Sequence, residues 1–179
     1  MSIDTLIDNV IAIEGDYSNH PADRGGPTRW GVTEGVARAH GYAGDMRHFP
    51  RSEAASIYKR KYWRRPGLDK INNHAPRLAE EMFDTGINMG PGIAAGFLQR
   101  ALNVLNRNGR DFPDIAVDRQ IGGQTLRALE SYLNKRGSNG EAVLLKAVDS
   151  LQGARYIKLA EKRRANEAFV YGWLANRIS

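Results

Sequence analysis

Two carboxylates and a glycine-rich loop lie close together near the start of the chain, in the run EGDYSNHPADRGGPTRWGVT over residues 14–33. Glu14 ends an apolar stretch with helical spacing, and Asp23 lies in a loop that Pro21 and Pro27 stiffen by fixing φ. The glycines of the loop can take backbone conformations that are closed to other residues. Two carboxylates in different surroundings are the minimum equipment for hydrolysing a glycosidic bond, and the run predicts that chemistry.

The two carboxylates should prefer different protonation states. Glu14 follows Ile11, Ala12 and Ile13, so part of its surroundings should be apolar and should favour the protonated form. Asp23 lies in a polar loop and should ionise more easily. We therefore expect Glu14 as general acid and Asp23 as base, water orienter or charge stabiliser. Alone, each residue fits a plainer interpretation, a surface carboxylate at a helix end or a turn residue, and the hypothesis depends on their combination.

Four neighbouring side chains complete the candidate site. Thr28 could orient a water molecule or cap a turn, and both interpretations stay open. Tyr17 and Trp30 offer flat faces for sugar rings, although aromatic residues at such a junction more often belong to the core. Arg29 could meet carboxylates of a substrate or face solvent.

The composition describes one ordinary globular chain of 179 residues, with 41% hydrophobic and 26% charged residues. There is no cysteine, which excludes disulfides and thiol-based zinc sites, and the four histidines lack metal-ligand spacing. We expect no metal and no cofactor. The start, MSIDTLIDNV, carries two aspartates and no basic residue, unlike a signal peptide, and no stretch is long enough to span a membrane. Synthesis in the cytoplasm is expected.

The net charge of +6 favours an anionic partner, which could be nucleic acid, a membrane surface or a bacterial envelope. Part of the charge is clustered in Lys59, Arg60, Lys61, Arg64 and Arg65, which we interpret as a solvated helix end. The chain has no helix-turn-helix or zinc-finger pattern, so nucleic acid is not expected as a partner.

The apolar spacing is helical nearly throughout and predicts a mainly α fold. The expected helices cover residues 3–14, 34–40, 53–63, a stretch around 78–83, 93–105, 124–132 and 140–178. Ser2 and Thr33 should be the N-caps of the first two helices, and Ser52 should start the third. The last helix should have a break near Gly153.

Strand signals are few, and the best are residues 30–33 and 115–117. Residues 107–123 interrupt the helical spacing and should form a loop or a short hairpin. We expect this interruption to divide a catalytic lobe, 1–106, from a helical region, 107–179, that packs on the same core.

Residues 14–33 resemble the signature of glycoside hydrolase family 108, the muramidase family of phage endolysins. The matching positions are Glu14, Gly15, Tyr17, Pro21, Ala22, Asp23, Gly25, Gly26, Thr28, Gly31 and Thr33. The chain departs at Asp16, where the pattern prefers glycine, and Asp16 adds a third carboxylate beside the site. The resemblance implies that Glu14 is catalytic, and a similarity to more distant phage lysozymes implies the same for Asp23 and Thr28.

The resemblance continues beyond the signature. Phe83-Asp84, Asn88, Gly90 and residues 98–102 look like the middle of the same family. Asn88 could contact substrate or form a buried hydrogen-bonded pair with Asp84. The segment VDRQIGGQTLRAL resembles a motif of predicted peptidoglycan-binding regions, with Asp118 in a loop-capping role and Thr125 in a helix-capping role.

The resemblance implies a lysozyme-like helical bundle with at most a short β-hairpin near the active site. It implies an endolysin that hydrolyses the bond between N-acetylmuramic acid and N-acetylglucosamine in peptidoglycan and waits in the host cytoplasm until a holin opens the membrane. A prophage or secretion-associated muramidase would look the same. We expect a monomer, whose basic C-terminal helix could also meet an anionic outer-membrane surface. The alternatives are a lytic transglycosylase and a non-catalytic peptidoglycan-binding protein.

Overall fold

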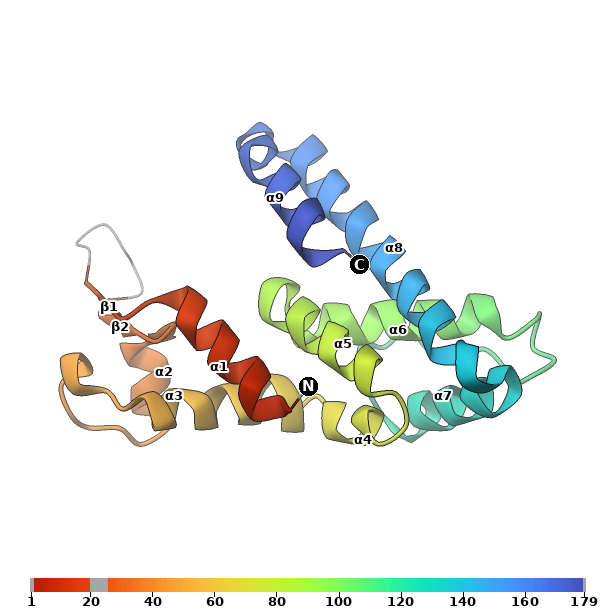
Figure 1. Ribbon diagram of the computed structural model, residues 1–179, viewed down its shortest axis with the longest axis horizontal. Helices are drawn as coiled ribbons and strands as arrows, with labels where there is room; N and C mark the ends of the chain where they lie inside the picture. Colours follow the sequence, from red (N-terminus) through yellow and green to blue (C-terminus); the bar gives the residue numbers. More distant parts are fainter. Residues whose placement is uncertain (1, 20–25, 179) are drawn as a thin grey trace. The chain divides into compact units, whose positions relative to one another are not determined.

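Helices make up most of both compact units into which the chain divides, residues 1–65 and residues 66–179 (Figure 1). The computed structural model describes residues 2–19 and 26–178. The expected mainly α fold with a small β element is confirmed. No helix within the described ranges combines the length and the apolar content that crossing a membrane requires.

The first unit begins with a helix, continues into a small sheet and ends in helices. Its elements are α1 (Ile3–Glu14), β1 (Tyr17–Ser18), β2 (Thr28–Arg29), β3 (Val32–Thr33), α2 (Glu34–Ala39), the 3-10 helix η1 (Met46–His48), α3 (Arg51–Tyr58) and the π-helix η2 (Lys59–Arg64). The strands form one antiparallel sheet in the order β1-β2-β3. The sheet follows α1 and precedes α2 directly, so a helix anchors the chain at each end of it.

Side-chain caps and burial explain why α1 forms where the sequence predicts it. The Ser2 side chain accepts a hydrogen bond from the backbone N–H of Thr5 at 3.1 Å, which satisfies a free donor of the first turn. Ile7 and Ile11 lie one turn apart and are buried in the core. Gly15 ends the helix with a φ of +81°, as expected for a glycine after the last helical residue.

The starts of α2 and α3 differ in how they are capped. At α2, the Thr33 side chain accepts from the N–H of Val36 at 3.4 Å, as expected. At α3, the prediction that Ser52 starts the helix is wrong, because Ser52 lies inside the first turn. The backbone carbonyl of Pro50 accepts from the N–H of Ala54 at 3.2 Å, so the helix begins without a side-chain cap.

The helix that the sequence predicts over residues 53–63 widens into a π-helix from Lys59. The N–H of Arg65 donates to the carbonyl of Arg60 at 2.9 Å, a bond that spans five residues instead of four. Trp63 is buried within this segment. Such wide turns are rare and concentrate at functional sites, and apolar spacing does not distinguish them from an α-helix.

The second unit is entirely helical in its regular elements. These are α4 (Leu68–Asn72), α5 (Pro76–Met89), α6 (Pro91–Leu105), α7 (Gly123–Arg136), the 3-10 helix η3 (Gly137–Asn139), α8 (Gly140–Lys162), the 3-10 helix η4 (Arg164–Asn166) and α9 (Glu167–Arg177). Helix α6 packs against α5, α7 and α8. The largest buried side chains of this core include Leu78, Met82, Phe83, Leu98, Leu102, Leu129, Tyr132 and Leu144.

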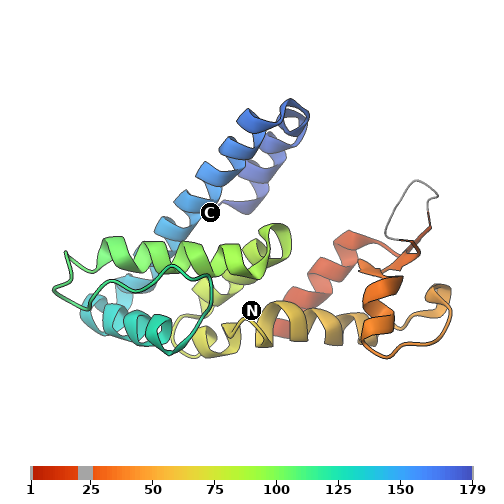
Figure 2. The same cartoon turned by 180° about the vertical axis from the view of Figure 1, so that it is seen from behind.

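Helices α8 and α9 form a hairpin, seen in blue in Figures 1 and 2. The predicted break near Gly153 is wrong, since α8 continues to Lys162 and the chain reverses at residues 163–166. One glycine costs a helix only about 1 kcal/mol, less than the packing of a long helix supplies. Gly153 instead faces Leu174 of α9, and the Asn166 side chain closes the turn by donating to the carbonyl of Leu159 at 2.9 Å.

Residues 106–122 connect α6 to α7 and contain no strand. The strand and hairpin that the sequence suggests near Ile115 are therefore wrong. The reason is that Asn103 of α6 bonds the backbone of Ile115 twice, accepting from its N–H at 2.9 Å and donating to its carbonyl at 2.8 Å. A side chain thus replaces the partner strand.

Candidate active site

The candidate acid, Glu14, is the last residue of α1. Its side chain lies outside the described part of the structure, as do residues 20–25 with the candidate base Asp23. After the turn at Gly15 the chain enters β1 at Tyr17. The backbone of Glu14 is therefore only three residues from the first strand of the small sheet.

The three apolar residues before Glu14 differ in burial. Ile11 is fully buried, whereas Ile13 is 79% exposed and Ala12 is exposed as well. Because α1 turns by about 100° per residue, only one of three consecutive residues can face the core. Ile13 therefore lies at the surface, and the expectation that Glu14 has partly apolar surroundings stays a prediction.

The turn between β2 and β3 consists of two residues, Trp30 and Gly31. Both have positive φ, +53° for Trp30 and +71° for Gly31, which is the backbone of a type I′ hairpin turn. Glycine takes this conformation without strain, but tryptophan does so rarely. A strained residue of this kind persists only where its surroundings hold it.

Arg29 and Asp16 hold the sheet together beside Trp30. Arg29 Nε donates to Asp16 Oδ1 at 2.8 Å, and the backbone N–H of Trp30 donates to the Asp16 carbonyl at 3.2 Å. Arg29 also donates to the carbonyl of Arg47. The interpretation of Arg29 as a solvent-facing side chain is wrong, because its side chain is only 20% exposed.

The indole of Trp30 is fixed on two sides. Its Nε1 donates to the carbonyl of Phe49 at 3.2 Å, and the Arg29 guanidinium lies 5.1 Å from the centre of its ring. The residue is half-buried rather than part of the core. Its contact with a sugar ring stays a prediction.

Thr28 lies in β2, half-buried, opposite Ser18 and Thr33 in the sheet. Its hydroxyl donates to the carbonyl of Gly26 at 3.3 Å, the contact that turn capping predicts. A hydroxyl that donates there can still accept from a water molecule. Both interpretations of Thr28 therefore remain compatible with this geometry.

A pocket of about 670 Å³ lies beside Tyr17. Its lining combines Tyr17, Asn19 and Pro27 with Glu34, Arg38 and the segment 43–47. Tyr17 is 39% exposed, so its ring is available to a ligand in this pocket. The volume falls within the range of common ligand sites.

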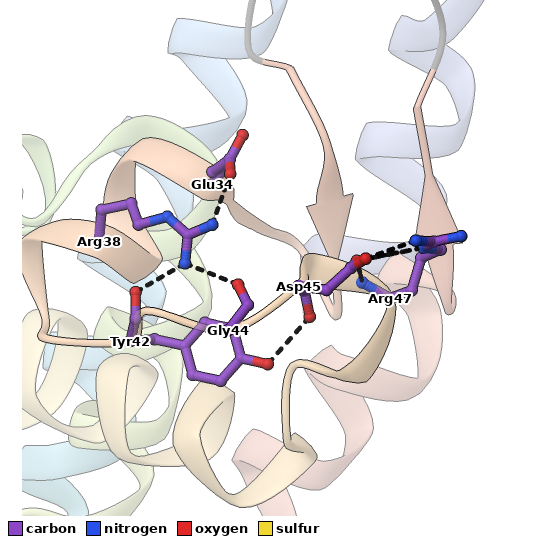
Figure 3. Close-up of polar contacts among 6 residues, drawn as sticks. All are labelled: Glu34, Arg38, Tyr42, Gly44, Asp45 and Arg47. Carbon is purple, nitrogen blue, oxygen red and sulfur yellow. Dashed lines mark hydrogen bonds and ion pairs between the residues drawn. The ribbon is translucent and has the colours of Figure 1, made fainter.

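The far wall of this pocket is a network of charged groups that sequence reasoning missed (Figure 3). Arg38 donates to Glu34 Oε1 at 2.7 Å and to the carbonyls of Tyr42 at 2.8 Å and Gly44 at 2.7 Å. The i,i+4 spacing of Glu34 and Arg38 on one helix was the available signal. No sequence pattern indicated the two contacts with backbone carbonyls, because they depend on the path of the loop.

Asp45 and Arg47 form the second charged pair of the wall, with Arg47 Nη2 at 2.6 Å from Asp45 Oδ2 (Figure 3). Side-chain and backbone hydrogen bonds from Arg47 hold the pKa of the Asp45 carboxyl far below its usual range. The Tyr42 hydroxyl donates to the Asp45 carbonyl at 2.9 Å. Each arginine of the wall thus has its own carboxylate, so the wall is charge-balanced and rich in hydrogen-bonding groups.

Asn88 belongs to the second unit, on α5. Its amide donates to the Asp84 carbonyl at 2.8 Å and to Asp84 Oδ2 at 3.1 Å, and Arg177 pairs with Asp84 Oδ1 at 2.9 Å. The predicted Asp84–Asn88 pair is present, but Asn88 is exposed rather than buried. Substrate contact by Asn88 stays a prediction.

Glu81 of α5 is a perturbed carboxyl that the sequence did not indicate. Burial, followed by the nearby carboxylates of Asp149 and Asp84, raises its pKa to about 7. Its Oε1 accepts from the Thr85 hydroxyl at 3.2 Å. Within residues 2–19 and 26–178, no three His, Asp or Glu side chains gather so that they could hold a metal ion.

Comparisons with known proteins agree with this architecture. A solved structure described as that of SagA from Brucella abortus matches with a TM-score of 0.60 at 18% sequence identity, covering 98% of this chain and 94% of that chain. This similarity supports the fold. No curated protein sequence matches the chain.

Two family models match successive parts of the sequence. Residues 7–90 match Glycosyl hydrolase 108, and residues 93–178 match the Predicted Peptidoglycan domain. The matches support a glycoside hydrolase that acts on peptidoglycan and has peptidoglycan as its partner. The division into functional lobes after residue 106 stays a prediction. The chain belongs to the glycosyl hydrolase 108 family through residues 7–90 and continues into a predicted peptidoglycan domain.

Proposed function

We propose that the protein is a muramidase that hydrolyses the bond between N-acetylmuramic acid and N-acetylglucosamine, with Glu14 as general acid. One observation carries the proposal: within the segment matched to the family, Glu14 is placed at the end of α1, just before a fixed sheet. A general acid must hold its proton close to the glycosidic oxygen, and a rigid helix end can position it there.

The remaining catalytic roles are assigned by exclusion among neighbouring carboxylates. The Asp16 carboxylate accepts from Arg29 Nε at 2.8 Å, and its backbone carbonyl accepts from the N–H of Trp30 at 3.2 Å, so Asp16 has a structural task in the sheet. Asp23 is therefore the proposed base or charge stabiliser, and Thr28 the residue that accepts from the attacking water. Whether the anomeric configuration is retained or inverted depends on the separation of the two carboxyl groups.

The pocket beside Tyr17 is the proposed sugar subsite. Tyr17 offers its ring, and the charged wall supplies donors and acceptors for hydroxyl and acetamido groups. Trp30 does not line this pocket, and we propose it as a separate aromatic contact for a sugar ring, with its indole fixed by the bond to Phe49. We further propose that Arg29 and Asn88 contact the substrate.

The informative experiment is a turbidity assay on cells with a permeabilised outer membrane. Glu14→Gln should reduce the rate of lysis by at least about 100-fold, because a general acid typically contributes that much. Glu167→Gln, an exposed carboxylate on α9, is the matched control and should lyse like the parent. Equal lysis by Glu14→Gln and the parent contradicts the assignment. Mass spectrometry of the products then separates hydrolysis from transglycosylation, since only the latter leaves anhydromuramyl ends.

A second activity is proposed for the α8–α9 hairpin, contact with an anionic outer-membrane surface. Exposed basic residues lie where the hairpin turns, near exposed Phe169 and Tyr171, namely Lys158, Lys162, Arg163 and Arg164. Lysis that survives heat denaturation would support it. The phage endolysin origin, holin-dependent release from the cytoplasm and a monomeric state complete the proposal.

A further inference from the structure

A second pocket, of about 360 Å³, lies within the predicted peptidoglycan domain. It opens between residues 112–115 and one face of α7, and no residue of the candidate active site lines it. Its walls are a loop without regular structure and a helix. Whether such a pocket can bind a ligand depends on how firmly the loop is held.

Side-chain amides of α6 hold the loop along its length. Asn103 makes the two bonds to the backbone of Ile115 described above. Asn106, three residues further on, donates to Asp114 Oδ1 at 2.7 Å and accepts from the N–H of Gly109 at 3.0 Å. These contacts fix both the backbone and one carboxylate of the pocket wall.

Gln99, one turn before Asn103, extends the same set of contacts. Its buried amide donates to Asp118 Oδ1 at 2.7 Å and accepts from the N–H of Arg119 at 2.9 Å. Asp118 Oδ1 also accepts from the N–H of Gln120 at 2.9 Å, so the predicted loop cap is present. Thr125 is not a helix cap as predicted, because it lies inside α7 and bonds Gln99.

The pocket has an apolar floor and polar groups on both walls. Phe112, Ile115 and Ala128 supply apolar surface. Gln124, Arg127 and Ser131 share a face with Ala128, because their spacing of three and four residues follows the helix period.

The two charged groups of the pocket have opposite signs and lie on opposite walls. Asp114 is fixed on the loop by Asn106. Arg127 is exposed on α7 and, among the described residues, makes no ion pair. Its Nη1 lies 3.1 Å from where a Cβ on Gly123 would be, so the glycine leaves room for the guanidinium along the first turn of the helix.

We propose that this pocket binds a short peptide that carries both a free carboxylate and a free ammonium group, as the stem peptides of peptidoglycan do. Arg127 receives the carboxylate, Asp114 receives the ammonium group, and the apolar floor receives the aliphatic part of the peptide. This inference rests on the proposed function, because it takes peptidoglycan as the polymer that the protein binds. It assigns recognition of the peptide to residues other than those proposed to cleave the glycan. A neutral sugar chain would use neither charge, and an anionic lipid surface would be repelled by Asp114.

The test is calorimetric titration of the full-length Glu14→Gln protein with the synthetic tetrapeptide L-Ala–γ-D-Glu–meso-diaminopimelate–D-Ala. Arg127→Gln and Asp114→Asn should each raise Kd by about tenfold, the loss expected for one charged hydrogen bond. Ser131→Trp, at the half-buried rim, should block binding. A tetrapeptide with amidated carboxylates should bind the Glu14→Gln protein more weakly than the unmodified tetrapeptide does. Its Kd should not change when Arg127→Gln is added.

The control is Arg110→Gln, an exposed arginine in the same loop that does not line the pocket. An equal loss from Arg110→Gln, or no binding of the tetrapeptide to the parent, overturns the inference. Binding of chitotetraose that depends on Arg127 overturns it as well. Hydrolysis of sacculi by the wild type is measured separately, so failure of the peptide site and failure of the proposed muramidase activity are distinguishable.

Discussion

Trp30 has a φ of +53°, which is strained for a residue with a bulky aromatic side chain, and several neighbours hold it there. Its indole N–H reaches the Phe49 carbonyl, and its backbone N–H reaches the Asp16 carbonyl. Arg29 lies over its ring. One residue thus connects the turn of the sheet to the segment that follows η1, which explains how the small sheet keeps its geometry beside Glu14.

Replacing Trp30 with phenylalanine should remove the bond to Phe49 while keeping an aromatic ring. We expect a loss of about 1 kcal/mol in the free energy of unfolding, measured by urea denaturation. The control is Trp173→Phe, because Trp173 stacks on Tyr156 in the second unit. If both variants lose the same amount, the indole hydrogen bond is not what holds the turn.

Glu81 should make the stability of the protein depend on pH. Its folded-state pKa is raised to about 7 from an ordinary value of 4.5. Between these values the unfolded chain releases the proton while the folded protein keeps it, so stability falls as pH rises. Below about pH 4.5 both states are protonated and the penalty vanishes.

Glu81→Gln should remove that dependence and keep an acceptor for the Thr85 hydroxyl. Urea denaturation should show little difference from the parent near pH 4 and a gain on the order of 1–2 kcal/mol near pH 8, after allowance for partial exposure. Glu161→Gln, an exposed residue on α8, should follow the parent at both pH values. A constant difference across this range would show that Glu81 does not titrate as described.

At the scale of elements, the β2–β3 hairpin depends on Gly31. Its φ of +71° is a conformation that costs other L-residues about 1–2 kcal/mol. Gly31→Ala should therefore lower the free energy of unfolding by that amount and reduce lysis, since the hairpin carries Thr28 and Trp30.

Gly35→Ala makes the same chemical change within α2, where an added methyl group meets nothing within 4 Å. We expect it to be neutral or to stabilise by up to about 1 kcal/mol, because alanine is the better helix former. Thermal unfolding of the two variants compares them directly. Equal destabilisation by both would mean that backbone conformation at Gly31 is not the cause.

The elements that the sequence predicted are those whose signals are local. The capping residues Ser2 and Thr33 located the starts of α1 and α2, and the apolar spacing located α5 and α6. The π-helix at Lys59 was missed, because a change from four-residue to five-residue bonding leaves little trace in apolar spacing.

The errors in the second unit have a common cause in tertiary contact. The helix break near Gly153 was expected from propensity, but α9 packs over that position. A strand was expected at residues 115–117, but Asn103 takes the bonds at Ile115 that a partner strand would make. At the candidate site, residues 14–33 suggested the chemistry, whereas the contacts of Arg29, Arg38 and Phe49 depend on loop paths that no local pattern specifies.

For the molecule as a whole, the excess of positive charge is spread over both units. By the sequence, residues 1–65 carry ten basic and eight acidic side chains, and residues 66–179 carry sixteen and twelve. The net charges are therefore +2 and +4, which together give the +6 of the chain. Both units should therefore contribute to any attraction between the net charge and an anionic polymer.

A distributed charge of this kind predicts binding that weakens with salt. Fixed charges are screened over about 10 Å at 0.1 M ionic strength and over about 3 Å at 1 M, so long-range attraction should fade across that range. The Glu14→Gln protein should pellet with purified sacculi several-fold more weakly at the higher salt. Binding to neutral chitin, measured alongside, should change little. If pelleting with sacculi does not depend on salt, the affinity comes from short-range contacts, such as those of the pocket beside Tyr17. The net charge would then not contribute to wall binding.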